Sequence, residues 1–151
     1  MEIDVHSDLE AIRRRRAELR ESLGALEAAL AAPAGGRAVV WGERVHATLE
    51  GLRDEFVEHV AITEGPDGLH QTILAGAVRL ANAVSALTAD HTVIDAEIQA
   101  LLVATEPPVT PDDVPGVREL ATRLLGHVLR HRQRGADLVY EAYDTDIGGG
   151  D

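Results

Sequence analysis

Six polar residues stand at positions where a helical pattern of apolar side chains is otherwise unbroken. They are Arg16, His59, His91, His127, His131 and Arg134. Neutral imidazoles bind transition metals, exchange protons and form hydrogen bonds, whereas a guanidinium stays cationic and binds no metal. Burying such groups without partners is costly, so each must be solvated, hydrogen-bonded to a carboxylate or bound to a ligand. These residues therefore predict a polar site inside an apolar interior.

The apolar residues around them recur at alternating steps of three and four, which is typical of helices with one buried face. One such stripe consists of Leu19, Leu23, Leu26 and Leu30. Proline- and glycine-containing breaks separate the stripes, and we expect helices at about residues 8–32, 38–74, 78–104 and 112–143, followed by a glycine-rich tail at 146–151. Four stripes with short connections predict an all-α, up-down-up-down four-helix bundle that forms a single domain over residues 1–151.

The position of the middle reversal decides whether the histidines meet. Segment 65–68 resembles a turn, and Ala75 lies in a second candidate turn. A reversal near Ala75 places His59 level with His91, whereas a reversal at segment 65–68 separates them by about 24 Å along the axis at 1.5 Å per residue. We therefore expect the second helix to continue past Pro66 with a kink.

Counting residues outward from the other two turns in the same way places further polar residues at the level of His59 and His91. A turn centred near Val109 places His127 level with His91, and a turn near residue 36 places Arg16 within one helical turn of His59. His70 is expected to be peripheral. The carboxylates expected to serve the layer are Glu64, Asp95 and Glu141.

Three short segments carry a resemblance to a known family. Residues 59–64, 89–91 and 126–131 are similar to motifs of the hemerythrin-like (HHE cation-binding) family, and the likeness extends over roughly residues 9 to 143. Members of that family are four-helix bundles that hold two non-haem irons with histidines and carboxylates in the core. The resemblance implies a metal site whose ligands come from His59, Glu64, His91, His127 and His131.

The chain departs from that family at two of the ligand positions. Arg16 stands where the first helix would provide a histidine, and His131 and Arg132 stand where a carboxylate would follow His127. A fixed cation opposes a nearby metal dication, and Arg16 could instead engage Glu64. We therefore expect one metal ion, with iron as the candidate, or none, and we do not expect a complete two-iron centre.

Composition narrows the function classes. The net charge of −12, from 14 basic and 26 acidic residues, opposes nucleic-acid binding, and the absence of cysteine excludes disulfides and thiolate sites. No apolar stretch predicts a membrane span, so we expect a cytoplasmic protein. The sequence contains no recognisable arrangement of catalytic residues, so we do not expect an enzyme. We expect an iron-binding module that senses or stores O2, NO or redox state. The alternative is a metal-free bundle with a structural or protein-interaction role, and a protein partner or homo-oligomer stays open.

Overall fold

The computed structural model of the chain describes residues 5–143 and is all-helical over that range, as the sequence predicts. The α-helices are α1 (Val5–Ala31), α2 (Ala38–Glu64), α3 (Leu69–Gly76), α4 (Ala81–Ala104) and α5 (Val114–Tyr140). Short 3-10 turns at Val78–Leu80 and Pro111–Asp113 lead into α4 and α5. None of the helices in this range is by itself long and apolar enough to cross a membrane, although one bent pair, Ala38–Gly76 with Val78–Ala104, satisfies the length and composition test together.

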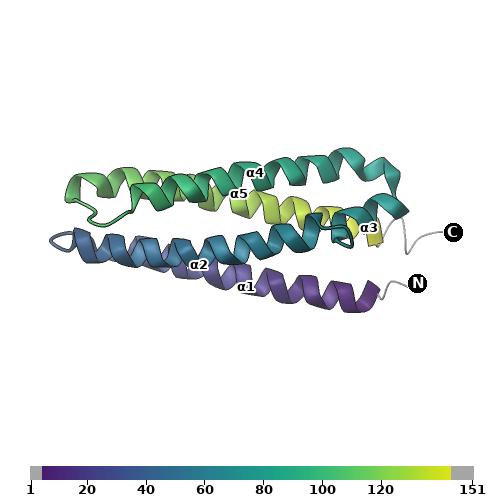
Figure 1. Ribbon diagram of the computed structural model, residues 1–151, viewed down its shortest axis with the longest axis horizontal. Helices are drawn as coiled ribbons and strands as arrows, with labels where there is room; N and C mark the ends of the chain where they lie inside the picture. Colours follow the sequence, from purple (N-terminus) through teal and green to yellow (C-terminus); the bar gives the residue numbers. More distant parts are fainter. Residues whose placement is uncertain (1–4, 144–151) are drawn as a thin grey trace.

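The four long helices lie along the long axis of the molecule (Figure 1). Helix α1 packs against α2, α4 packs against α5, and α2 also contacts α4. The connections 32–37 and 105–113 lie at one end of the bundle, and α3 lies at the other end (Figure 1). Each long helix therefore passes the middle of the bundle, where side chains from different helices meet.

The expected kink at Pro66 is a complete break between two helices. Helix α2 ends at Glu64, Gly65 is extended, and the separate helix α3 follows before the chain reverses at Ala77. Proline lacks the backbone N–H that a continuous helix needs at this point. A Cβ atom at Gly68 would lie 2.5 Å from the carbonyl oxygen of Ile62, so the tight turn requires glycine there. The expected single helix over 38–74 is therefore corrected to α2 and α3, while the reversal falls close to the expected place.

The connection between α4 and α5 is fixed to the bundle by one close approach. Val109 is buried, and a Cβ atom at Gly42 of α2 would lie 2.4 Å from its Cβ. Thr110 and Asp113 form a capping box at the start of the following 3-10 turn. Glycine at position 42 thus lets this connection sit directly on α2.

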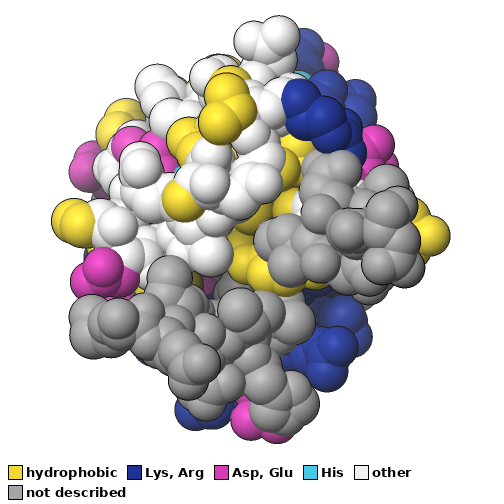
Figure 2. All heavy atoms as spheres, turned by 90° about the vertical axis from the view of Figure 1, so that its right-hand side faces the viewer, with side chains coloured by type: hydrophobic (Ala, Val, Ile, Leu, Met, Phe, Trp, Pro, Cys, Tyr) yellow, Lys and Arg dark blue, Asp and Glu magenta, His cyan; other side chains and the backbone are white. Residues whose placement is uncertain are grey.

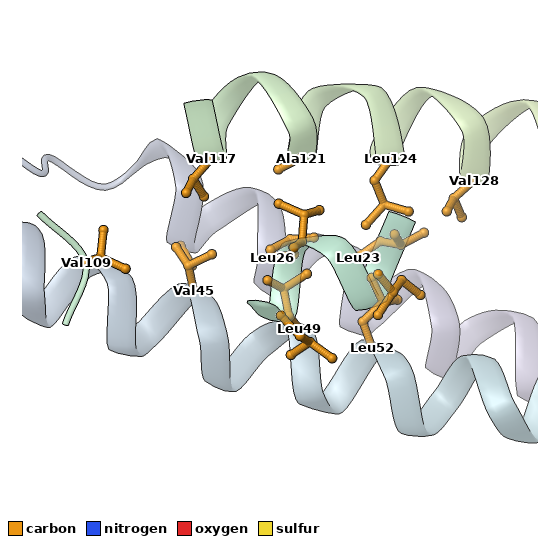
Figure 3. Close-up of a cluster of buried hydrophobic side chains, with 14 of the residues drawn as sticks. Leu23, Leu26, Val45, Leu49, Leu52, Val109, Val117, Ala121, Leu124 and Val128 are labelled. Carbon is orange, nitrogen blue, oxygen red and sulfur yellow. The ribbon is translucent and has the colours of Figure 1, made fainter. Parts of the chain in front are cut away.

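Two hydrophobic clusters fill the interior. The larger one joins α1, α2, α4 and α5, and Figure 3 shows its α5 side chains facing those of α1 and α2. The smaller one lies towards the α3 end and consists of Ile73, Ala77, Leu80, Val84, Leu87, Leu138 and Ala142. Along α2, α4 and α5, the residues between the two clusters include His59, His91 and His131. A polar layer therefore divides the apolar interior.

Candidate metal centre

Three histidines from three helices converge in this layer. Nε2 of His131 lies 3.1 Å from Nε2 of His91 and 3.3 Å from Nε2 of His59. The three rings each offer one ligand nitrogen, and these nitrogens all lie within 4.8 Å of one another. His91 and His131 are 3% and 4% exposed, and His59 is partly buried. The expectation that His59 and His91 are level is confirmed, because their ring centroids are 5.1 Å apart. This group, called the histidine triad below, is spaced so that it could hold a metal ion.

Carboxylates face the outer nitrogens of two triad members. Nδ1 of His131 donates to Asp90 at 3.0 Å, and Asp90 is held in turn by Arg134 at 3.0 Å. An oxygen of Glu64 lies 3.1 Å from Nδ1 of His91, although the two are not aligned as a hydrogen bond. Histidines that bind metals usually engage a carboxylate or carbonyl through the nitrogen that faces away from the metal. Asp90 and Glu64 occupy those positions here.

Burial favours the neutral imidazole at His59 and His91. Desolvation, followed by the repulsion of neighbouring His91 and His131, lowers the pKa of His59 to about 3. Desolvation is also the main cause that lowers the pKa of His91, against the opposing effect of Glu64. Phe56 contributes to this dry environment, since its ring stacks on His59 and meets His91 edge-on. The neutral imidazole is the form that binds a metal ion.

Two residues of this environment were not predicted from the sequence to belong to it. His70 of α3 is buried, its ring lies parallel to that of His91 at 5.8 Å, and burial lowers its pKa to about 4. Asp90, rather than the exposed Asp95, is the α4 carboxylate that serves the triad. A signal for His70 was present, because it precedes the buried Ile73 and Ala77 by three and seven residues, the spacing of one helix face.

The structure does not bring His127 into the triad. Its Nδ1 instead pairs with Glu97 of α4, and it lies one turn before His131 on α5. His131, not His127, is therefore the α5 residue level with His91. The level of a residue across a connection depends on how the connection is folded, and the spacing in the sequence does not reveal that the 105–113 segment shifts α5 by about one turn.

Arg16 lies beside the triad but pairs with no acidic side chain among residues whose side chains are described. It lines a pocket together with His59 and His131, whereas Glu64 faces His91. Burial, followed by repulsion from Arg132 and Arg13, lowers the pKa of Arg16. Arg134, the last of the predicted polar residues, is exposed and pairs with Asp90. The suggested pair between Arg16 and Glu64 is thus not formed.

Comparisons with known proteins do not extend this description. No family model, curated protein or solved structure matches the chain.

Proposed function

We propose that this chain is a metal-binding module with an up-down-up-down, hemerythrin-like bundle, which holds one transition-metal ion on His59, His91 and His131. The observation that carries the proposal is the convergence of three Nε2 atoms from three helices, with a carboxylate at the opposite nitrogen of two of the rings. Two imidazole nitrogens bound to the same tetrahedral ion at about 2.0–2.1 Å would be roughly 3.3 Å apart. The spacings of 3.1 and 3.3 Å are close to that value.

The protonation of His91 gives a second argument. If Nδ1 of His91 carries the proton, its Nε2 lone pair faces that of His131, whose own proton is directed at Asp90, across 3.1 Å. If Nε2 carries the proton, the Nδ1 lone pair faces the Glu64 oxygen across 3.1 Å. With an ionised Glu64, each neutral tautomer therefore brings two acceptors together. A metal ion bound by the Nε2 atoms would remove the repulsion between the two facing lone pairs in the first of these tautomers.

The surroundings favour one ion over two. The carboxylates of Glu64 and Asp90 face two of the triad rings and would offset the charge of one dication, while Arg16 and Arg132 line a pocket with His59 and His131 and would oppose a second. Imidazole ligands suit iron, zinc, copper and nickel, and we propose iron because of the resemblance described above. An iron ion would supply reversible redox change and binding of small ligands such as O2 or NO. Sensing or storage in the cytoplasm, without catalysis, is the role we propose for it.

Metal loading with two matched variants tests the proposal. Metal-free protein is loaded anaerobically with ferrous iron, and separately with zinc, then desalted and analysed for metal content. We expect wild type to retain about one ion per chain, His131→Gln to lose it, and His127→Gln to retain it. The control removes an imidazole from the same helix, one turn away, where the partner is Glu97. Wild type without metal, or equal losses in both variants, would contradict the proposal.

A metal-free module is the second candidate. The same spacings of 3.1 and 3.3 Å are ordinary hydrogen-bond lengths, so neutral imidazoles could form a structural polar layer. The bundle would then act through contacts with a protein partner or with a second copy of itself. Retention of neither iron nor zinc by wild type, with an unchanged thermal midpoint in their presence, would favour this candidate.

A further inference from the structure

A pocket adjoins the triad and has a different chemical character. Its wall joins apolar side chains, among them Leu19, Leu69, Leu87 and Leu138, to polar ones, which are three arginines (Arg15, Arg16 and Arg132), three histidines (His59, His70 and His131) and Thr63. Figure 2 shows the end of the molecule at which α3 lies, where hydrophobic side chains are visible near the centre and basic side chains lie at the upper right and along the lower edge. The pocket thus combines an apolar surface with positively charged side chains.

Two of the three arginines of this wall have no acidic partner among the residues whose side chains are described. Arg15 at the rim is paired with Glu18 and Glu58 at 3.2 and 3.3 Å. Arg16 from α1 and Arg132 from α5 have no such carboxylate partner there, although the chain as a whole carries a net charge of −12. Arg132 lies near enough to repel Arg16, and both are partly buried. Two unpaired like charges beside an apolar wall are costly, and a bound anion would relieve that cost.

We infer that this pocket binds a small organic carboxylate, whose head group contacts Arg16 and Arg132 and whose short apolar tail packs against Leu19, Leu69 and Leu138. Guanidinium groups match carboxylate geometry through paired N–H donors. The apolar wall distinguishes such a ligand from inorganic phosphate or sulfate, which have no tail to bury. Binding requires no metal, so this inference goes beyond the proposed metal site and does not depend on it.

Butyrate is the probe, and the metal-free protein is the sample. Titration by two-dimensional NMR or calorimetry should show saturable binding of butyrate and at least tenfold weaker binding of 1-butanol, which has the tail without the charge, and of inorganic phosphate, which has charge without the tail. Equal affinities for butyrate and 1-butanol would overturn the role of the arginines. Stronger binding of phosphate would overturn the role of the apolar wall.

Two variants locate the binding. Arg16→Gln should weaken butyrate binding at least tenfold, whereas Arg123→Gln, which removes the same charge from an exposed pair with Glu119, should leave it unchanged. As a measurement of folding, Arg16→Gln should have a thermal midpoint no lower than that of wild type, because it removes a cation repelled by Arg132. Butyrate should raise the midpoint of wild type and of Arg123→Gln only. Equal affinity in both variants, or no butyrate binding by wild type, would overturn the inference.

Discussion

The two ends of the bundle are built from the same long helices but bury different kinds of side chain. Towards the 32–37 and 105–113 connections, the interior positions hold side chains such as Leu26, Leu49 and Ile98, none of which is measurably exposed. In the layer that follows, histidines from α2, α3, α4 and α5 take up interior positions. Beyond that layer, the smaller apolar cluster fills the interior of the part that the structure describes. Helices α4 and α5 run without a break through both halves, but the chemistry of their buried side chains changes.

This difference separates the main source of stability from the candidate metal centre. A buried leucine stabilises the fold by about 1.5–3 kcal/mol through removal from water. A buried imidazole whose pKa is lowered by desolvation costs free energy whenever it has to be charged. Proteins commonly accept such local costs at functional sites, and compensate for them elsewhere. The larger hydrophobic cluster is the compensating region here.

The largest effect on stability is expected in the apolar half. Leu49→Ala should lower the free energy of unfolding by ~2–5 kcal/mol, because Leu49 is 0% exposed and the neighbouring helices cannot close the resulting cavity. Leu129→Ala is the control, since that side chain is 65% exposed, and it should change stability by less than ~0.5 kcal/mol. Chemical denaturation measures both. Similar losses in the two variants would mean that the apolar half is not the stabilising one.

Acidification should lower the free energy of unfolding through the buried histidines. The unfolded chain takes up protons near the ordinary histidine pKa of 6.5, whereas folded His59 and His70 take them up only near 3 and 4. Stability of the metal-free protein should therefore fall as pH drops below about 6.5, by roughly 2 kcal/mol at pH 5 for each of the two residues. Denaturation of His59→Leu should show a decline that is smaller by about that amount. Parallel declines in wild type and variant would refute the assignment to His59.

The same variant sharpens the comparison at neutral pH. His59→Leu should change the stability of the metal-free protein at pH 7.5 by no more than about 1 kcal/mol, because leucine keeps the contact with Phe56 and removes a polar group from the interior. His131 retains its partners His91 and Asp90. A loss as large as that of Leu49→Ala would show that the histidine layer itself stabilises the fold.

The smallest effect concerns the cation beside the triad. Arg16→Gln should tighten zinc binding by roughly 1 kcal/mol, since it removes a positive charge that lines the same pocket as His59 and His131. Competition with a chromophoric chelator measures the affinity, and Arg123→Gln should match wild type. Weaker zinc binding by Arg16→Gln would show that Arg16 supports the site instead of opposing a cation.

The sequence predicts the helices and part of the site, for identifiable reasons. The spacing of leucines and the breaks at 33–36 and 106–111 are local, so the four long helices are predictable. The reversal near Ala77 is also predictable, because it follows from placing His59 level with His91. The helix break after Glu64 was not predicted, since a proline is compatible with a kink as well as a stop.

The composition of the site depends more on tertiary structure. His131 rather than His127 meets His91 because α5 is shifted by one turn, and neither residue type nor spacing contains that shift. Asp90 reaches the triad from α4 across to α5, whereas the expected Asp95 is exposed. His70 joins the layer because α3 folds as a separate helix against α4. Each of these contacts joins elements whose relative placement is set by packing.

The most direct measurement is anomalous diffraction from crystals of the metal-loaded protein, recorded at the absorption edge of zinc or iron. We expect one peak per chain at bonding distance, about 2.0–2.1 Å for zinc, from the Nε2 atoms of His59, His91 and His131. We also expect Asp90 to keep its hydrogen bond to Nδ1 of His131. A peak at His127 and Glu97, two peaks in the bundle core, or no peak at the triad would contradict the proposed metal site.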